Sequence, residues 1–374
     1  MATDETMMAA ALQLARRAAG RTSPNPLVGA VVVAGDAVVG RGYHAKAGDP
    51  HAEVLALGEA GNCARDATLY TTLEPCDHSA RTGPCTEAIL SAGVRRVVVA
   101  MIDPDRRVNG RGIARLRAAG VAVEVGLLEA EARHTNEFYL KHRRTGLPFV
   151  CLKWAMSLDG RIAADRTRAT AITGGASRQY AHELRNLYDA LLVGVQTVLA
   201  DDPLLTCRLG AATVPAPRNP LRVIVDSRIR TPSTARIIQD LSTAPTLIAA
   251  TRVAPAERVE AMRQAGVEVL VQGREEGLVD LRALMEELGC RGILSVLIEG
   301  GGRVNASALE AGLVDKVIGF VAPRLLGGIG RGAPTPIETD APGRAGARPE
   351  DQSLYRVAIR TLGEDVVIEG YLEP

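Results

Sequence analysis

The chain has 374 residues, of which 47% are hydrophobic and 23% charged, proportions that indicate a folded globular protein rather than a disordered chain. At roughly 150 residues per domain, this length predicts two or three domains. The 44 basic and 43 acidic residues leave a net charge of +1, and only 3% of residues are aromatic. We therefore expect no extended nucleic-acid surface and no polybasic membrane patch.

The start of the chain carries Asp4 and Glu5 where a secretory signal needs Lys or Arg, and no apolar run approaches the ~18 residues of a membrane span. We therefore expect a cytoplasmic protein located in the cytosol. Its cysteines are widely spaced, which argues against a disulfide framework in a reducing compartment and leaves metal ligation or burial to explain them. They are Cys63, Cys76, Cys85, Cys151, Cys207 and Cys290.

The first part of the chain alternates predicted helices and strands, which indicates an α/β sheet layered by helices. Two β-branched runs around Gly35 and Asp36 predict a hairpin. Asp49 and Pro50 favour a helix start, which would put His51 in the first helical turn. The expected helices span 5–19, 49–60, 84–92, 113–119 and 129–142, and the expected strands span 28–33, 37–43, 67–73, 95–101 and 121–125.

A second α/β pattern begins after Gly146, so the expected domains are 1–146 and 147–374. Residues 199–208 are expected to form a loop that holds a cationic side chain, Arg208, in position. Residues 327–348 are expected to form a surface loop. The expected strands span 149–154, 190–194, 221–226, 246–251, 267–271, 295–299 and 316–321, followed by a hairpin of 355–362 and 365–372. The expected helices span 177–187, 255–265, 278–288 and 304–311.

Four residues in the first half have the order of a catalytic zinc site: His51, Glu53, Cys76 and Cys85. One imidazole and two thiolates supply three ligands to Zn²⁺, and a catalytic zinc keeps its fourth position for water. Glu53 would move protons from the attacking water to the departing amine. His-x-Glu followed by Pro-Cys-x-x-Cys is typical of zinc nucleobase deaminases, although the two cysteines here lie nine positions apart instead of three.

Two other interpretations of these residues stay open at this point. His51 could be a capping histidine beside two cysteines that are simply buried. Alternatively, the zinc could be structural. Structural zinc sites usually have four protein ligands, and Glu53 would have no role in such a site.

In the second half, the expected strand at 295–299 runs into Gly300, Gly301 and Gly302 and then a helix. Free glycine amides at a helix start are suited to a phosphate, although a turn without a ligand would look the same. Ser227 and Arg228 follow another strand and offer the hydroxyl and guanidinium that the 2′-phosphate of NADPH needs. Arg228 could equally be a solvated loop residue.

Motifs along nearly the whole chain resemble the family of bifunctional riboflavin-biosynthesis deaminase-reductases. The resemblance implies a cytidine-deaminase-like three-layer domain followed by a dihydrofolate-reductase-like α/β domain, and it makes the long cysteine spacing a family feature. The matching segments are 23–29, 42–44, 51–54, 72–76, 81–85, 110–112, 157–160, 198–203, 205–208, 226–227, 299–301 and 322–327.

For the first domain, the resemblance implies zinc-dependent hydrolytic deamination of 2,5-diamino-6-(5-phosphoribosylamino)pyrimidin-4(3H)-one. Glu53 then corresponds to the catalytic residue, and His51, Cys76 and Cys85 to the metal ligands. The positions that match contacts to the pyrimidine or the phosphate are Asn25, His44, His78 and Arg81. Ala80 and Gly83 replace the usual Gly and Pro of this loop, and no ligand is lost.

For the second domain, the resemblance implies reduction of the ribose arm to a ribityl chain by NADPH. Ala169 and Ala171 stand where the family commonly has Ser and Trp, which weakens the expected contacts. The cofactor positions are Ala155, Thr197, Asp201, Ser227, Gly301, Gly302 and Arg303. The substrate positions are Lys153, Arg185, Leu205, Arg208 and Glu299.

Two competing functions remain to be weighed: a nucleoside or tRNA deaminase with an accessory domain, and an inactive scaffold stapled by zinc. Balanced charge and few aromatic residues argue against the first, and the presence of Glu53 argues against the second. We expect small-molecule pyrimidine phosphates as substrates, no nucleic-acid or membrane partner, and a homo-oligomer.

Overall fold

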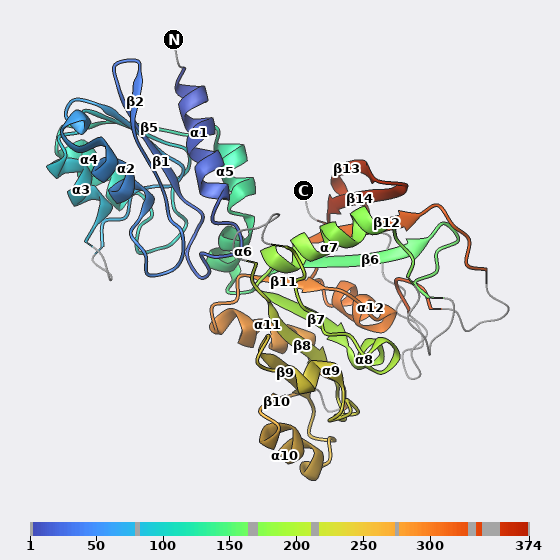
Figure 1. The fold of residues 1–374 in the computed structure, drawn as a ribbon. Helices are drawn as coiled ribbons and strands as arrows, with labels where there is room; N and C mark the ends of the chain where they lie inside the picture. Colours follow the sequence, from blue (N-terminus) through green and yellow to red (C-terminus); the bar gives the residue numbers. More distant parts are fainter. Residues whose placement is uncertain are drawn as a thin grey trace. The chain divides into compact units, whose positions relative to one another are not determined.

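The computed structural model describes residues 3–78, 83–163, 171–210, 217–273, 277–327, 334–338 and 352–372. The chain forms two compact units, Met1–Gly146 and Leu147–Pro374. Each unit has a sheet and a hydrophobic core of its own (Figure 1). No helix among the described residues has both the length and the apolar character needed to cross a bilayer.

Unit 1 contains a five-stranded sheet of order β2-β1-β3-β4-β5. The expected hairpin is confirmed, because β1 pairs antiparallel with β2; β1 also pairs antiparallel with β3, and β3, β4 and β5 are parallel. The strands are β1 (Gly29–Ala34), β2 (Ala37–Tyr43), β3 (Thr68–Thr71), β4 (Arg96–Val99) and β5 (Ala122–Val125). The helices are α1 (Asp4–Arg16), α2 (Ala52–Ala60), η1 (Gly61–Ala64), α3 (Cys85–Ser91), α4 (Arg111–Ala118), α5 (Glu129–Thr135) and α6 (Glu137–Thr145).

Glycines on the first two strands let helices approach both faces of this sheet. A Cβ on Gly29 would lie 2.0 Å from the carbonyl oxygen of Ala11 in α1, and one on Gly42 would lie 2.2 Å from that of Ala52 in α2. Gly29 and Gly42 point to opposite faces, because Gly42 is the partner of Ala30 and successive residues alternate across a strand. The expected three-layer arrangement is confirmed.

Two boundaries differ from expectation in unit 1. His51 is extended at φ −73°, ψ 157°, so it is the N-cap of α2 rather than a residue of its first turn. The single helix expected over 129–142 is two helices, which meet at Asn136. Asn136 bonds through its side chain to the backbone N–H and C=O of Leu27, at 2.8 and 2.9 Å, a contact that local periodicity does not reveal.

Unit 2 contains a nine-stranded sheet of order β10-β9-β8-β7-β11-β6-β12-β14-β13, and the pairs from β10 to β12 are parallel. The C-terminal hairpin is confirmed and extends the sheet in antiparallel fashion. The strands are β6 (Phe149–Ser157), β7 (Ala190–Gly194), β8 (Leu221–Val225), β9 (Thr246–Ala250), β10 (Glu268–Val271), β11 (Ser295–Ile298), β12 (Lys316–Ala322), β13 (Tyr355–Leu362) and β14 (Asp365–Tyr371). The helices are α7 (Gly175–Leu187), α8 (Val195–Asp201), α9 (Arg236–Gln239), α10 (Ala256–Gln264), α11 (Leu281–Cys290) and α12 (Gly302–Glu310).

One segment expected as a loop is partly helical, because residues 199–201 form the end of α8. This helix follows β7 directly, with Gly194 both as the last residue of the strand and as the N-cap of the helix, so no separate turn segment marks its start. Most of the loop expected at 327–348 lies outside the described residues, as does Ala169.

Candidate active sites

The three expected metal ligands of unit 1 converge from separate elements. His51 caps α2, Cys76 follows β3, and Cys85 opens α3. His51 Nδ1 lies 3.1 Å from Cys85 Sγ and 3.5 Å from Cys76 Sγ, and the three ligand atoms all lie within 4.8 Å of one another. Ligands that share one tetrahedral zinc, at about 2.0–2.3 Å from the ion, have similar separations.

The chemistry of these donors also fits a zinc ion. Contact between the two thiols lowers the pKa of Cys76 to about 4 and raises the pKa of Cys85. The backbone N–H of Cys85 also donates to Cys76 Sγ at 3.4 Å, so the start of α3 stabilises a thiolate there. Among the described residues, no fourth His, Cys, Asp or Glu joins this group. The described donors are therefore one imidazole and two sulfur atoms.

Glu53 lies beside the triad on the first turn of α2. Its side chain is buried, and Oε2 lies 3.5 Å from Cys85 Sγ. Burial and the charge of Cys76 raise the pKa of Glu53 to about 7. A carboxyl group that titrates near neutral pH can both accept and donate a proton.

A cavity of about 380 Å³ opens onto this group. It brings together most of the residues that the sequence singled out in unit 1. His44 contacts Asn25 at 3.0 Å and the Pro50 carbonyl at 3.2 Å, so two lining residues hold each other in place. Arg81 lies outside the described residues. The sequence-selected lining residues are Asn25, His44, His51, Glu53, Cys76 and His78.

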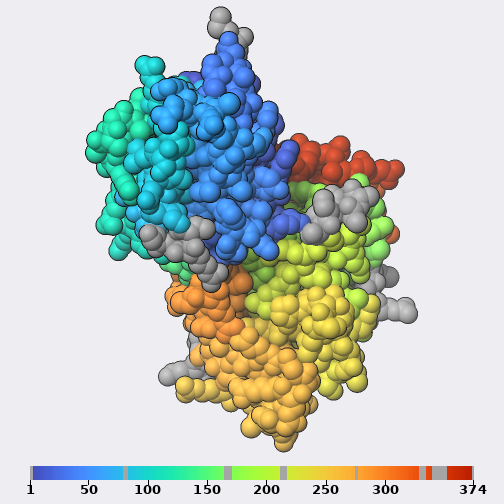
Figure 2. Space-filling model, turned by 60° about the vertical axis from the view of Figure 1, so that its left-hand side comes forward, coloured from blue at the N-terminus to red at the C-terminus, as the bar shows by residue number. Residues whose placement is uncertain are grey.

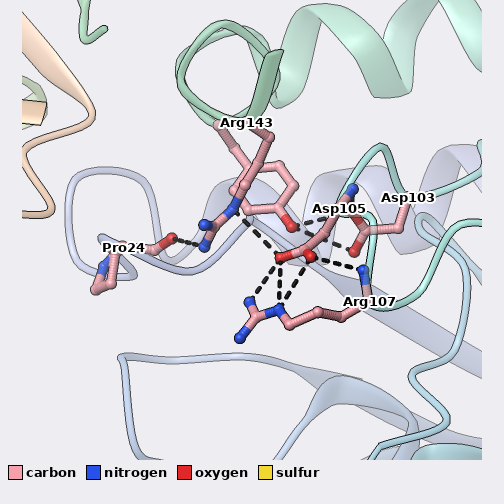
Figure 3. A network of polar contacts seen from close by, with 6 residues as sticks. Pro24, Asp103, Asp105, Arg107 and Arg143 are labelled. Atoms are coloured by element: carbon pink, nitrogen blue, oxygen red, sulfur yellow. Dashed lines mark hydrogen bonds and ion pairs between the residues drawn. The ribbon is translucent and has the colours of Figure 1, made fainter. Parts of the chain in front are cut away.

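The same cavity is lined by polar residues that sequence reasoning missed, shown in close-up in Figure 3. They lie after β4 and on α6, and β4 is the parallel neighbour of β3, which leads to Cys76. The carboxyl ends of neighbouring parallel strands lie at the same edge of a sheet. The two acidic residues of the run Asp103-Pro104-Asp105 could therefore have indicated that this loop lies near Cys76. The missed residues are Asp103, Asp105, Arg107, Tyr139 and Arg143.

Glu74 connects the metal-binding segment to the loop after β4. Its buried carboxylate accepts backbone hydrogen bonds from Asp103 at 3.3 Å, Gly110 at 2.9 Å and Gly112 at 3.1 Å. A Cβ on Gly112 would lie only 1.9 Å from the carbonyl oxygen of Pro75. The start of α4 is therefore packed directly against the residue that precedes Cys76.

A second cavity, of about 760 Å³, lies in unit 2 at the carboxyl ends of parallel strands. Thr197 Oγ1 would be 3.3 Å from a Cβ on Gly300, so the glycine turn passes close to α8. Ala155 lies on β6 opposite Phe320 and is not among the described residues that line the cavity. The lining residues expected for the cofactor are Thr197, Asp201, Ser227, Gly301, Gly302 and Arg303.

The residues expected for the reductase substrate form a charged cluster. Arg185 donates two hydrogen bonds to Glu299, at 2.9 and 2.7 Å, and one to the Thr206 carbonyl at 3.1 Å. Lys153 Nζ lies 5.4 Å from the centroid of the Phe320 ring. Burial lowers the pKa of Lys153, although the charge of Glu299 acts in the opposite direction.

Two further residues that the sequence analysis did not single out hold this cluster in place. The His182 ring contacts the backbone N–H and the Nε of Arg208, at 3.3 and 3.4 Å. Burial and two nearby arginines lower the pKa of His182 to about 4, so it is neutral at pH 7. Arg222 is fully buried and donates to the Leu204 carbonyl at 3.1 Å, next to Leu205, whose φ is +52°.

Comparisons with known proteins find relatives that match both units of the chain. The family model for the RibD C-terminal domain matches residues 148–368, and that for the zinc-binding region of cytidine and deoxycytidylate deaminases matches residues 1–101. The riboflavin biosynthesis protein RibD of Aquifex aeolicus is 41% identical over 367 residues, covering 98% of this chain and 97% of that protein. RibD of Escherichia coli K12 is also 41% identical, with 98% of each chain covered.

Solved structures show the same similarity. Acinetobacter baumannii RibD has a TM-score of 0.86 and 36% identity, with 99% of each chain covered. A Thermotoga maritima diaminohydroxyphosphoribosylaminopyrimidine deaminase/5-amino-6-(5-phosphoribosylamino)uracil reductase has a TM-score of 0.82 and 33% identity, with 98% of each chain covered.

Proposed function

Because this chain belongs to the RibD family of riboflavin biosynthesis proteins, we propose that it catalyses two reactions on one pyrimidine phosphate. Residues 1–146 hydrolyse the 2-amino group of 2,5-diamino-6-(5-phosphoribosylamino)pyrimidin-4(3H)-one, and residues 147–374 then reduce the ribose arm with NADPH. The observation that carries this proposal is the convergence of His51, Cys76 and Cys85 beside the buried carboxyl group of Glu53.

His51, Cys76 and Cys85 would hold the zinc ion, which would supply the Lewis acidity that activates water for the deamination. Glu53 accepts a proton from the water that adds to C2 and delivers a proton to the amino group, which leaves as ammonia. Its side chain is buried beside the ligand Cys85, where a carboxyl group can pass a proton between the water and the amino group. Asn25, His44 and His78 line the cavity and orient the pyrimidine.

In the reduction, NADPH held in the cavity of unit 2 would supply the hydride for C1′ of the ribosylamino group, whose ring oxygen would leave C1′ and take a proton from solvent. Backbone amides at Gly301 and Gly302 fit the cofactor phosphates, because these residues carry no side chain over the start of α12. Ser227, Arg228 and Arg303 add a hydroxyl and two cations to the same cavity. Ala155, Thr197 and Asp201 complete the proposed cofactor contacts.

The cluster around Arg185 serves the substrate of this second reaction. Arg185 and Arg208 are suited to the 5′-phosphate. Leu205 directly precedes Thr206, whose carbonyl accepts a hydrogen bond from Arg185. Lys153 orients the sugar from beside Glu299, with which it interacts electrostatically.

The decisive test is Glu53→Gln in the full chain. We expect ammonia release to be lost while zinc content and NADPH oxidation on the deaminated intermediate stay at the wild-type level, because Glu53 lies beside the metal ligands without being needed as one. Glu59→Gln, on the exposed side of the same helix, is the matched control. Substantial ammonia release by Glu53→Gln would contradict the role of Glu53.

We also propose a homo-oligomer in the cytosol. Strand β13 is one of the two edge strands of the nine-stranded sheet, lies at the surface (Figure 2, red), and exposes 50% of Val357 and 69% of Ile359. An exposed apolar edge strand is a common site of chain association. Light scattering measures the oligomeric state directly, and a monomer would contradict the proposal.

The cytosolic location fits the proposed metal site, because a reducing compartment would keep Cys76 and Cys85 available as ligands.

A further inference from the structure

The cavity of unit 1 contains a polar group that the proposed deamination does not use. Asp103, Asp105, Arg107, Tyr139 and Arg143, here called the arginine cluster, line the same cavity as His51, Glu53 and Cys76. The guanidinium groups of Arg107 and Arg143 both turn toward the Asp105 carboxylate, one from each side (Figure 3).

The cluster has two carboxylates and two guanidinium groups, but both guanidinium groups pair with the same carboxylate. Arg107 Nη2 lies 2.6 Å from Asp105 Oδ2, and Arg143 Nε lies 3.6 Å from the same oxygen. The hydrogen bond from Arg107 lowers the pKa of Asp105 to about 2, so this carboxylate is ionised at neutral pH. Asp103 bonds instead to the Tyr139 hydroxyl at 3.0 Å and the Asp105 N–H at 2.9 Å. One carboxylate thus faces two guanidinium cations.

Both arginines keep donors for a ligand. Arg107 Nη1 has no partner among the described residues, and the side chain is 66% exposed. Arg143 Nε is buried and makes no hydrogen bond within the described part of the chain. Its Nη2 makes only a long contact of 3.5 Å to the Pro24 carbonyl, and the guanidinium lies 5.1 Å from the centroid of the Tyr139 ring.

The loop that carries Arg107 is held in place before any ligand binds. The Asp103 carboxylate accepts from the N–H of Asp105, and the Asp105 carboxylate accepts from the N–H of Arg107 at 3.0 Å, which are two successive turns closed by side chains. Glu74 accepts from the N–H of Asp103 and so ties this loop to the segment that leads to Cys76.

The geometry points to a phosphate site: Arg107 and Arg143 bind the phosphate of the phosphoribosyl arm while the pyrimidine lies at Glu53. This inference rests on the proposed deaminase function and names the residues that recognise the arm. A guanidinium offers paired donors that match phosphate oxygens. Because Arg143 is already held against the Tyr139 ring, its side chain loses less conformational entropy when the phosphate binds.

The test compares two substrates, the 5′-phosphate and its dephosphorylated counterpart, in wild type, Arg107→Gln and Arg143→Gln. We expect each variant to lose roughly 10- to 100-fold in kcat/KM on the phosphate, mainly through KM, as expected for a charge-assisted hydrogen bond. Activity on the dephosphorylated compound should stay at the wild-type level. Arg106→Gln is the matched control, because Arg106 is exposed and outside the cavity lining.

Equal losses on both substrates, or no loss on either, would overturn the phosphate site. Zinc content and NADPH oxidation at wild-type levels exclude misfolding of either unit. If the wild-type chain released no ammonia, the proposed deaminase function would fail instead. In that case, calorimetric titration of the full chain with ribose 5-phosphate tests the phosphate site by itself. Weaker binding of this compound by both variants than by Arg106→Gln would support the site, and equal binding would overturn it.

Discussion

Glu299 is a carboxylate buried between two cations of unit 2. Its side chain is 5% exposed, Arg185 pairs with it at 2.7 Å, and the charge of Lys153 also acts on it. Burial alone would raise its pKa, but the two cations outweigh burial and lower the pKa of Glu299 to about 2. The folded-state pKa is therefore below the unfolded value of 4.5, and the resulting stability is present above pH 4.5 and lost as pH falls toward 2.

We expect Glu299→Gln to lower the free energy of unfolding of unit 2 by about 3–5 kcal/mol at pH 7, because it leaves Arg185 buried without its counter-charge. The same variant should lose less stability than wild type between pH 4.5 and pH 3. Urea unfolding followed by the fluorescence of Trp154, the only tryptophan, reports on this unit. Glu286→Gln, at an exposed position of α11, controls for the loss of one charge. Equal stability of the two variants at pH 7 would contradict the prediction.

At the scale of elements, the contact between the start of α4 and the Glu74–Cys76 segment supports the metal site. Gly112→Ala would place a methyl group 1.9 Å from the Pro75 carbonyl oxygen, so one of the two backbones must move. We expect a loss of about 1–3 kcal/mol in stability of unit 1, together with weaker zinc binding, because Cys76 follows Pro75 directly.

Thermal unfolding and a zinc competition titration measure these two effects of Gly112→Ala. Gly58→Ala is the matched control: Gly58 is an exposed residue of α2, and among the described residues no atom outside the neighbouring helix backbone would lie within 4 Å of a Cβ there. Alanine there should raise stability by up to about 1 kcal/mol through helix propensity. Unchanged zinc affinity in Gly112→Ala would show that this contact does not support Cys76.

The sequence predicted the elements whose signals are local, and it missed what long-range contacts decide. Alternating β-branched residues located the hairpin of β1 and β2. The order of His51, Cys76 and Cys85 predicted a metal site, and the structure brings these three side chains together. The break at Asn136 depends on Leu27, which is 109 residues away. Arg107 and Arg143 meet only because α6 returns to the end of β4, so no local pattern linked them.

At the scale of the whole molecule, each unit has its own sheet and core, and each carries one proposed activity. Similarity to RibD proteins over nearly the full chain favours this two-reaction arrangement over a nucleoside deaminase with an accessory domain. The three zinc ligands come from α2, the segment after β3, and α3, so a bound ion would link three elements of unit 1 alone.

Removal of zinc should therefore affect the two units differently. A ligand that binds only the folded state adds stability of RT ln(1 + [L]/Kd), so a chelator should lower the unfolding temperature of unit 1 by several degrees and abolish ammonia release. The Trp154 transition and NADPH oxidation should stay unchanged, because both report on unit 2. His51→Asn should unfold at the lower temperature with or without chelator, whereas Cys63→Ser, at an exposed cysteine, should respond like wild type. If the Trp154 transition fell together with that of unit 1, the two units would unfold as one, and zinc would stabilise the whole chain.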